Sequence, residues 1–210
     1  MLKNKKILIF GGTGSLGRQL CRRLIKDNEV CVYSRDELKQ WTMKNDFKRN
    51  ENLRFFLGDI RNKNRVKESL QQIKPDTIII AAALKHVDVC EEASGECIKT
   101  NINGVENIVS SCLELEDTIY GSWAGREAIK VLFVSTDKAC EPVNVYGMSK
   151  SISERVVTNA YNKSRKINFI AVRYGNVLES RGSIIPLFKY QSENQDFLTL
   201  TSRNMTRFVM

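Results

Sequence analysis

Short apolar runs alternate along the chain with segments in which apolar residues recur at helical spacing. The first run, Lys6 to Phe10, ends in a pair of glycines, and the segment from Leu16 to Ile25 then carries apolar side chains at helical positions. This order predicts a strand, a tight turn and a helix at the start of the chain.

The alternation continues along most of the length. Further strands are predicted at Glu29 to Tyr33, Leu53 to Leu57, Thr77 to Ala82, Lys130 to Ser135 and Asn168 to Val172. Helices are predicted to include Val66 to Ile73, Ile98 to Leu113 and Ser149 to Tyr161. Because right-handed crossovers place helices on both faces of a parallel sheet, we expect an α/β fold with a doubly wound, Rossmann-like parallel sheet.

Two stretches depart from this pattern. Glu114 to Glu127 is polar and contains glycines, which favours a long exposed loop between a helix and a strand. After Pro186 the periodicity becomes irregular, and the sequence stops in the apolar segment Phe208 to Met210. We therefore expect the C-terminal portion to be incomplete.

Composition and charge narrow the class of protein. The 210 residues, 42% of them hydrophobic, suffice for one sizeable core. No apolar run approaches the roughly 20 residues of a membrane span, so we expect no membrane partner and a cytoplasmic location. The net charge of +9 is spread along the chain, which disfavours nucleic acid and suits an anionic small ligand. The six cysteines form no C-x-x-C pair and His86 is the only histidine, so we predict reduced thiols and no metal site.

A glycine-rich turn lies between the first strand and the first helix. Glycines at positions 11, 14 and 17 follow a G-x-x-G-x-x-G spacing, which lets the backbone approach phosphates that then meet the helix N-terminus. The alternative is an ordinary glycine-rich turn without a ligand. We predict a dinucleotide site here, with contacts from Gly11, Thr13, Gly14, Ser15, Leu16 and Gly17.

The end of the second strand bears on the choice of cofactor. Ser34 and Arg35 supply a hydroxyl and a guanidinium that suit a 2′-phosphate, so NADP is favoured over NAD, although Asp36 argues for NAD and Arg35 could be a solvated charge. Asp59 and Ile60 follow the third strand and are placed to meet the adenine edge. The alternative for Asp59 is a helix N-cap, and both roles can hold together.

A second constellation follows the fifth predicted strand. Thr136, Asp137 and Lys138 come directly after it, and Tyr146 precedes Lys150 by four residues, so both of these side chains share one helix face. In such a pair the ammonium lowers the tyrosine pKa, and the phenolate takes a proton from a substrate hydroxyl while hydride leaves. The alternatives are an exposed ion pair for Asp137 and Lys138 and a loop cap for Thr136.

Together these residues resemble the extended short-chain dehydrogenase/reductase superfamily, and within it the UDP-N-acetylglucosamine 4,6-dehydratases of the polysaccharide-biosynthesis group. The resemblance covers nearly the whole chain. Its motifs are the Gly11 to Gly17 turn, Tyr33 to Lys39, Gly58 to Arg61, Ala81 to Val87, Lys99 to Asn101, Ser135 to Ala139, Asn144 to Gly147, Arg173 to Val177, Ser180 to Ser183 and Met205 to Phe208.

Two positions refine the resemblance. Ordinary sugar 4,6-dehydratases carry Thr-Asp-Glu where this chain has Thr136-Asp137-Lys138, and 4-epimerases lack the acid and base pair. Long, membrane-attached members of the group carry methionine at the position of Tyr146. The chain therefore resembles the short, soluble, C5-inverting type.

The resemblance also implies a mechanism. Tyr146 acts as the base while NADP oxidises C4, Lys138 then removes the C5 proton, and Asp137 protonates the departing C6 hydroxyl. The stored hydride returns to C6, and reprotonation of C5 from the opposite face inverts it. An amine serves as the base only if its pKa is lowered, which Lys150 or partial desolvation would achieve.

The resemblance assigns further contacts. Implied cofactor contacts are Lys39, Ala81, Ala82, Ala83, Tyr146, Lys150 and Val177. Implied substrate contacts are Lys85, Asn101, Asn176, Arg181, Thr201 and Arg207. His86 follows the same buried strand as Lys85, and a structural role is as plausible for it as a functional one.

These assignments give an expected organisation. Residues 1–177 are expected to form the NADP-binding domain with the catalytic residues, and residues 178–210 to begin an incomplete substrate-binding region. The expected partner is a UDP-sugar, with assembly into a dimer or hexamer as in the family. The competing hypotheses are a nucleotide-sugar 4-epimerase or reductase on the same fold, and a protein that binds NADP without turnover.

Overall fold

The computed structural model describes residues 2–117, 128–180, 182–200 and 202–206. These contain a parallel sheet of six strands in the order β3-β2-β1-β4-β5-β6, which confirms the predicted doubly wound fold. The strands are β1 (Lys6–Phe10), β2 (Glu29–Ser34), β3 (Leu53–Leu57), β4 (Thr77–Ile80), β5 (Ile129–Val134) and β6 (Ile167–Val172).

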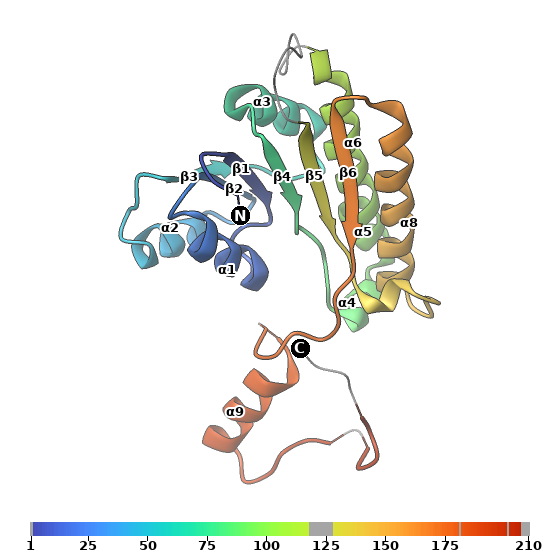
Figure 1. Cartoon of the computed structure of the whole chain (residues 1–210). Helices are drawn as coiled ribbons and strands as arrows, with labels where there is room; N and C mark the ends of the chain where they lie inside the picture. The colour runs from blue at the N-terminus through green and yellow to red at the C-terminus, as the bar shows by residue number, and fades with distance from the viewer. Residues whose placement is uncertain (1, 118–127, 181, 201, 207–210) are drawn as a thin grey trace.

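Helices cover both faces of the sheet (Figure 1). They are α1 (Ser15–Leu24), α2 (Glu37–Asp46), α3 (Lys63–Ile73), α4 (Val87–Glu92), α5 (Ser94–Ile98), α6 (Gly104–Glu114), α8 (Val145–Ala160) and α9 (Ile184–Asn194). Two 3₁₀ turns, Asp137–Ala139 and Tyr161–Lys163, and one π-helical turn, Lys99–Asn103, complete the described elements. Figure 1 shows α9 beyond the carboxyl ends of the central strands, apart from the helices that cover the sheet.

The side-chain alternation of β1 divides the interior into two cores. Ile7 and Ile9 pack on one face with residues of α1 and α2, whereas Leu8 and Phe10 pack on the other face with residues of α3, α6 and α8. All four of these side chains are fully buried. A strand buried on both faces has to be apolar throughout, which is why this short run was visible in the sequence.

Most predicted strands match the structure to within one residue, and the helices differ more. The strand at Thr77 ends at Ile80, two residues earlier than expected. Helix α8 begins at Val145, ahead of the expected Ser149, because the Asn144 side chain accepts a hydrogen bond from the Gly147 amide at 2.8 Å. This earlier start brings both Tyr146 and Lys150 onto the helix.

Helices α2, α4, α5 and α9 were not predicted. Asp36 caps α2 by accepting a hydrogen bond from the Lys39 amide at 2.9 Å. Helix α9 contains Pro186 in its first turn, where a helix has no use for the missing N–H, so the proline does not end it. Of the loop expected at Glu114 to Glu127, residues 118–127 lie outside the described part of the chain.

The described residues also include no helix that is both long enough and apolar enough to cross a membrane.

Glycine at position 17 is required by helix packing, which gives a test of the fold. A Cβ on Gly17 would lie 2.5 Å from Gly12 Cα, whereas one on Gly95 of α5 would meet nothing within 4 Å. We expect Gly17→Ala to lower the free energy of unfolding by about 1–3 kcal/mol through overpacking. The matched control Gly95→Ala should raise it by about 0.5–1 kcal/mol through helix propensity. Urea unfolding measures both, and equal stabilities for the two variants would contradict this account.

Candidate cofactor and active site

A cavity of about 320 Å³ opens at the carboxyl ends of β1, β2 and β4. In a doubly wound sheet this is the edge where ligands bind, at the point where the strand order reverses between β1 and β4. The cavity is lined by Gly11, Thr13, Gly14, Tyr33, Ser34, Arg35, Asp36, Lys39, Gly58, Asp59, Ile60, Ala81, Ala82, Ala83 and Thr100.

The floor of the cavity depends on the absence of a side chain at Gly11. This residue has φ +80°, and a Cβ on it would lie 2.6 Å from the Ala82 backbone nitrogen. No other residue type fits there without moving the loop after β4. The predicted glycine turn therefore serves as a cradle of bare backbone.

The N-terminus of α1 is open toward a ligand. Its N-cap is Gly14, which has no side chain to occupy the first amides, and its first turn holds no acidic residue. The backbone amides of a helix N-terminus and the positive end of the helix dipole suit an anion such as a pyrophosphate. The residues present therefore fit the phosphates of a dinucleotide.

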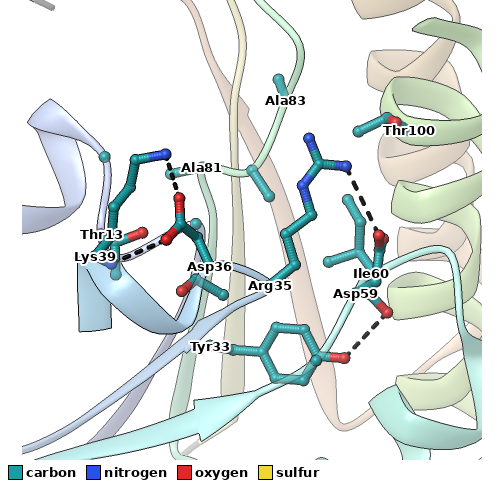
Figure 2. A pocket seen from close by; sticks show the side chains of 15 residues that line it. Thr13, Tyr33, Arg35, Asp36, Lys39, Asp59, Ile60, Ala81, Ala83 and Thr100 are labelled. Atoms are coloured by element: carbon teal, nitrogen blue, oxygen red, sulfur yellow. Dashed lines mark hydrogen bonds and ion pairs between the residues drawn. The ribbon is translucent and has the colours of Figure 1, made fainter. Parts of the chain in front are cut away.

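The cationic side chains of the cavity are each paired with a carboxylate, as Figure 2 shows. Arg35 Nη1 lies 3.7 Å from Asp59 Oδ2, and Lys39 Nζ lies 2.5 Å from Asp36 Oδ2. Burial acts to raise the pKa of Asp59, but hydrogen bonds from Arg61 and the charges of Arg61 and Arg35 outweigh it and hold the pKa below its usual value. An anionic ligand would thus meet cations already oriented by carboxylates.

Asp59 does not cap the following helix, contrary to one of the two roles considered for it. Asn62 caps α3 by accepting a hydrogen bond from the Arg65 amide at 3.1 Å. The Asp59 carboxylate accepts hydrogen bonds from the Arg61 guanidinium at 3.0 and 2.7 Å. Asp59 lines the cavity, and its contact with the adenine stays a prediction.

Some of the predicted cofactor contacts lie outside the cavity lining. Gly17 packs against Gly12, and Val177 is 41% exposed in the segment after β6. The residues outside the lining are Ser15, Leu16, Gly17, Tyr146, Lys150 and Val177. Conversely, the cavity includes Tyr33 and Thr100, which the sequence did not single out as contacts.

The catalytic candidates lie beside the cavity, at the carboxyl ends of β5 and β6. The Thr136 hydroxyl donates a hydrogen bond to Asp137 Oδ1 at 2.8 Å. Lys138 Nζ lies 3.1 Å from the same Asp137 oxygen and donates a hydrogen bond to Asn176 Oδ1 at 3.2 Å. The structure thus joins Thr136, Asp137, Lys138 and Asn176 in one continuous chain of polar contacts.

Backbone pairing sets this arrangement. The Ser135 amide donates to the Val172 carbonyl at 2.7 Å, and the Asp137 amide donates to the Tyr174 carbonyl at 3.0 Å. The loops after β5 and β6 therefore run together beyond the sheet. Thr136 also caps the 3₁₀ turn by accepting from the Lys138 amide at 3.4 Å, so its expected capping role is present.

The acid and base candidates have shifted pKa values. Burial raises the pKa of Tyr146 to about 12 and outweighs the hydrogen bond with Thr136, which acts in the opposite direction from burial. The expected net lowering of this pKa is therefore not what the structure shows. Burial also acts to raise the pKa of Asp137, but hydrogen bonds from Thr136 and Lys138 hold it below its usual value. Asp137 and Lys138 form an ion pair, with side chains 47% and 34% exposed.

Lys150 is held deep in the structure. Its ammonium group donates a hydrogen bond to the Val134 carbonyl at 2.7 Å and lies 4.1 Å from the centre of the Phe133 ring. The side chain is almost fully buried, and this desolvation lowers its pKa from 10.5 to about 7. At neutral pH a small change in its surroundings therefore changes its charge.

Asn101, a predicted substrate contact, is buried and engaged with the protein. Its side chain accepts from the Leu84 amide at 2.8 Å and donates to the Leu84 carbonyl and Ser149 hydroxyl, each at 3.0 Å. It lies in the π-helical turn, a feature frequent at functional sites. Asn101 thus fixes the loop after β4 to α8, and a contact with substrate stays a prediction.

The remaining predicted substrate residues have varied positions. Lys85 is exposed in the loop after β4, and Asn176 lies beside Lys138. A Cβ on Gly182 would lie 2.5 Å from His86 Cε1, so the segment at Gly182 packs over the imidazole. Arg181, Thr201 and Arg207 lie outside the described residues. Within the described ranges, no cluster of three His, Cys, Asp or Glu side chains is arranged to hold a metal ion.

The fold defines a Rossmann-like α/β domain of the short-chain dehydrogenase/reductase class. The chain belongs to the polysaccharide biosynthesis protein family, whose sequence profile matches residues 7–210. This confirms the resemblance inferred from the motifs.

Two curated relatives show the range of the family. The chain is 41% identical over 214 residues to the UDP-N-acetylglucosamine 4,6-dehydratase (inverting) of Campylobacter jejuni, covering 99% of this chain and 60% of that protein. It is 38% identical over 218 residues to the UDP-glucose 4-epimerase of Rickettsia bellii, covering 100% and 60%. These relatives are named as a nucleotide-sugar dehydratase and a nucleotide-sugar epimerase, and the chain spans about three fifths of their length.

Solved structures agree with the fold. Pen from Bacillus thuringiensis aligns with a TM-score of 0.89 and 37% identity, covering 99% of this chain and 63% of that one. DesIV, a dTDP-glucose 4,6-dehydratase from Streptomyces venezuelae solved with NAD bound, aligns with a TM-score of 0.74 over 89% of this chain and 62% of its own. At 22% identity this second likeness concerns the fold alone.

The depressed pKa of Lys150 gives a pH test. Between about 7 and 10.5 the unfolded chain holds a proton on this lysine that the folded chain has lost, so stability from this group rises with pH. Relative to Lys150→Met, the wild-type chain should gain up to about 1.4 kcal/mol per pH unit in this window. Urea unfolding of both proteins at several pH values measures the difference.

The comparison with the variant removes a background effect. Burial raises the pKa of Cys21 and Cys31 to about 12, so their unfolded thiols ionise first and lower stability at alkaline pH in both proteins alike. A difference between the two proteins that stays constant from pH 7 to 10 would show that Lys150 is not depressed in the fold.

Proposed function

We propose that the chain carries the cofactor site and the catalytic residues of an NADP-dependent UDP-N-acetylglucosamine 4,6-dehydratase that also inverts C5. The observation that supports this most is the chain of polar contacts from Thr136 to Asn176, in which an acid candidate, Asp137, contacts a base candidate, Lys138. A sugar epimerase has no use for that second pair. The similarity to a dehydratase of the inverting type points the same way.

NADP, when bound, supplies the means to oxidise C4 of the sugar and later reduce C6. Gly11 and the N-terminus of α1 would hold its pyrophosphate. Arg35 and Lys39 would face its 2′-phosphate. Each cation is paired with a carboxylate, Asp59 or Asp36, and its other side remains exposed to a ligand. This cationic pair is the reason for proposing NADP over NAD.

The side chains then divide the proton transfers. Tyr146, acting as the phenolate, takes the proton of the C4 hydroxyl, while the Thr136 hydroxyl holds Asp137 by a hydrogen bond. Before this transfer, the charge of Lys150 stabilises the phenolate form of Tyr146 that accepts the proton. With C4 a ketone, Lys138 removes the C5 proton and Asp137 donates a proton to the C6 hydroxyl, which departs as water.

The ion pair is poised for this elimination. As it stands, Lys138 carries the proton and Asp137 is ionised, which is the reverse of what base and acid need. Transfer of one proton across the 3.1 Å between Lys138 Nζ and Asp137 Oδ1 converts both at once. A substrate that displaces water from these half-exposed side chains favours the neutral pair, because low polarity disfavours separated charges.

The rest of the proposal extends beyond the described residues. Contacts of Arg181, Thr201 and Arg207 with the UDP moiety, a UDP-sugar as partner, and assembly as a dimer or hexamer belong to it. The proposal also includes a boundary after residue 177 between the cofactor-binding domain and the substrate-binding region, and a cytoplasmic location. The polypeptide that relatives carry beyond the matched three fifths would complete the sugar site.

A second candidate is a nucleotide-sugar 4-epimerase. It is favoured by the similarity to an enzyme named UDP-glucose 4-epimerase, at 38% identity. In this case Tyr146 and Lys150 serve the C4 oxidation alone, and Asp137 and Lys138 are an ion pair that only shapes the loop. The third candidate is a protein that binds NADP without turnover, in which Tyr146 and Lys150 have no catalytic role.

Incubation with UDP-N-acetylglucosamine and NADP separates these candidates. We expect a product lighter by one water, seen by mass spectrometry, and a fall of about 10²–10⁴-fold in its formation for Lys138→Ala. Lys99→Ala, which removes an exposed lysine paired with Glu96, is the matched control and should keep full activity. A product of unchanged mass would indicate the epimerase, and NADP binding without product would indicate the third candidate.

The cofactor preference has its own test. We expect Arg35→Ala to weaken NADP binding about tenfold or more, since it removes a charge-assisted contact to phosphate, and to change NAD binding about twofold at most. Isothermal titration calorimetry measures both cofactors. Arg54→Ala removes an arginine of β3 that pairs with Glu29 and should leave both affinities unchanged. Equal losses for NADP and NAD in the Arg35 variant would refute the assignment.

A further inference from the structure

An ion pair with no part in the proposed chemistry lies one helical turn beyond Lys150. The Arg173 guanidinium donates two hydrogen bonds to the Glu154 carboxylate, from Nε to Oε1 at 2.8 Å and from Nη2 to Oε2 at 2.6 Å. This forked geometry is the strongest form of ion pair between side chains. Arg173 follows β6 directly, so the pair ties the end of that strand to α8.

Glu154 belongs to a stripe along α8. Tyr146, Lys150 and Glu154 are spaced by four residues each, which places them on one helix face at successive turns. The Glu154 side chain is only 13% exposed, so its charge acts across protein rather than across water. The stripe therefore runs from the phenol through the amine to a carboxylate held by arginine.

The surroundings of Lys150 leave its charge dependent on this carboxylate. Its ammonium meets the Val134 carbonyl and the Phe133 ring from β5, and Cys97 from α5 is the other titratable group that acts on it. Burial lowers its pKa, and Glu154 is the strongest influence in the opposite direction. The Lys150 charge lowers the Glu154 pKa in turn, behind the larger effect of the hydrogen bond from Arg173.

We propose that Glu154, held in place by Arg173, is a positioning residue that maintains the positive charge of Lys150. Arg173 has two opposing effects: it fixes the carboxylate in the stripe, and it offsets part of the negative field that Lys150 receives. The consequence for catalysis rests on the proposed function, since only a charged Lys150 stabilises the Tyr146 phenolate. The electrostatic coupling itself does not depend on that function.

The coupling predicts that substitutions of Glu154 and of Arg173 shift the titration midpoint of Lys150 in opposite directions. Removing the carboxylate in Glu154→Gln should lower the titration midpoint of Lys150 by about one pH unit. Removing the guanidinium in Arg173→Gln leaves the carboxylate unopposed and should raise the midpoint. A pair that only fastens β6 to α8 would lower stability in both variants without moving the midpoint in opposite directions.

The measurement is an NMR titration of the full chain labelled with ¹³C at lysine Cε. Lys150→Met identifies the Lys150 signal, whose wild-type midpoint is expected near the pKa of about 7. Glu154→Asp retains the charge and should retain most of the midpoint, which separates charge from folding if Glu154→Gln is unstable. Arg54→Gln breaks the exposed pair of Arg54 with Glu29 and is the matched control.

The titration midpoints of Lys150 test the electrostatic coupling independently of any enzymatic activity. Midpoints that move down for Glu154→Gln and up for Arg173→Gln support it, and midpoints that stay fixed, or move the same way, overturn it. If the midpoints move as expected but UDP-N-acetylglucosamine yields no dehydrated product, the coupling stands and the proposed function fails. If product forms and the midpoints stay fixed, the function stands and the coupling fails.

Discussion

The rest of the site depends on the close approach of two backbones where the sheet reverses its order. Gly11 lies so near the loop after β4 that a single methyl group would overlap the Ala82 backbone. Because this crossing is bare, the cavity reaches the ends of both strands, and the helix that follows points its open N-terminus into it. Every later element of the site is placed relative to that floor.

The described charges around the site come mostly as pairs. Arg35 lies near Asp59, Lys138 near Asp137, and Arg173 near Glu154. Paired charges keep a ligand-binding surface from carrying a large net field, and they let a proton move between partners without creating an isolated charge. Lys150 differs, since its ammonium contacts a carbonyl and a ring rather than a carboxylate, and it is the group whose pKa falls close to neutrality.

The strands were predictable because each is a short apolar run buried by neighbours on both sides, and the parallel, doubly wound arrangement followed from the handedness of crossovers. The helices were harder to predict from the sequence. The cap by Asp36 that starts α2 and the place of Pro186 in the first turn of α9 depend on one or two residues each. The π-helical turn at Lys99–Asn103 has no periodicity of its own, so the prediction ran a single helix through it. That turn orients Asn101 toward Leu84 and Ser149.

By itself the sequence determined the parallel α/β class, the glycine turn and the Tyr146 and Lys150 pair, because spacing along one strand or helix fixes these. Only the tertiary structure decided which residues from different loops meet. The contact of Lys138 with Asn176 and the pairing of Arg173 with Glu154 join segments on β5, β6 and α8. It also decided the pKa of Lys150, since that value follows from burial, and burial is a property of the whole packed chain.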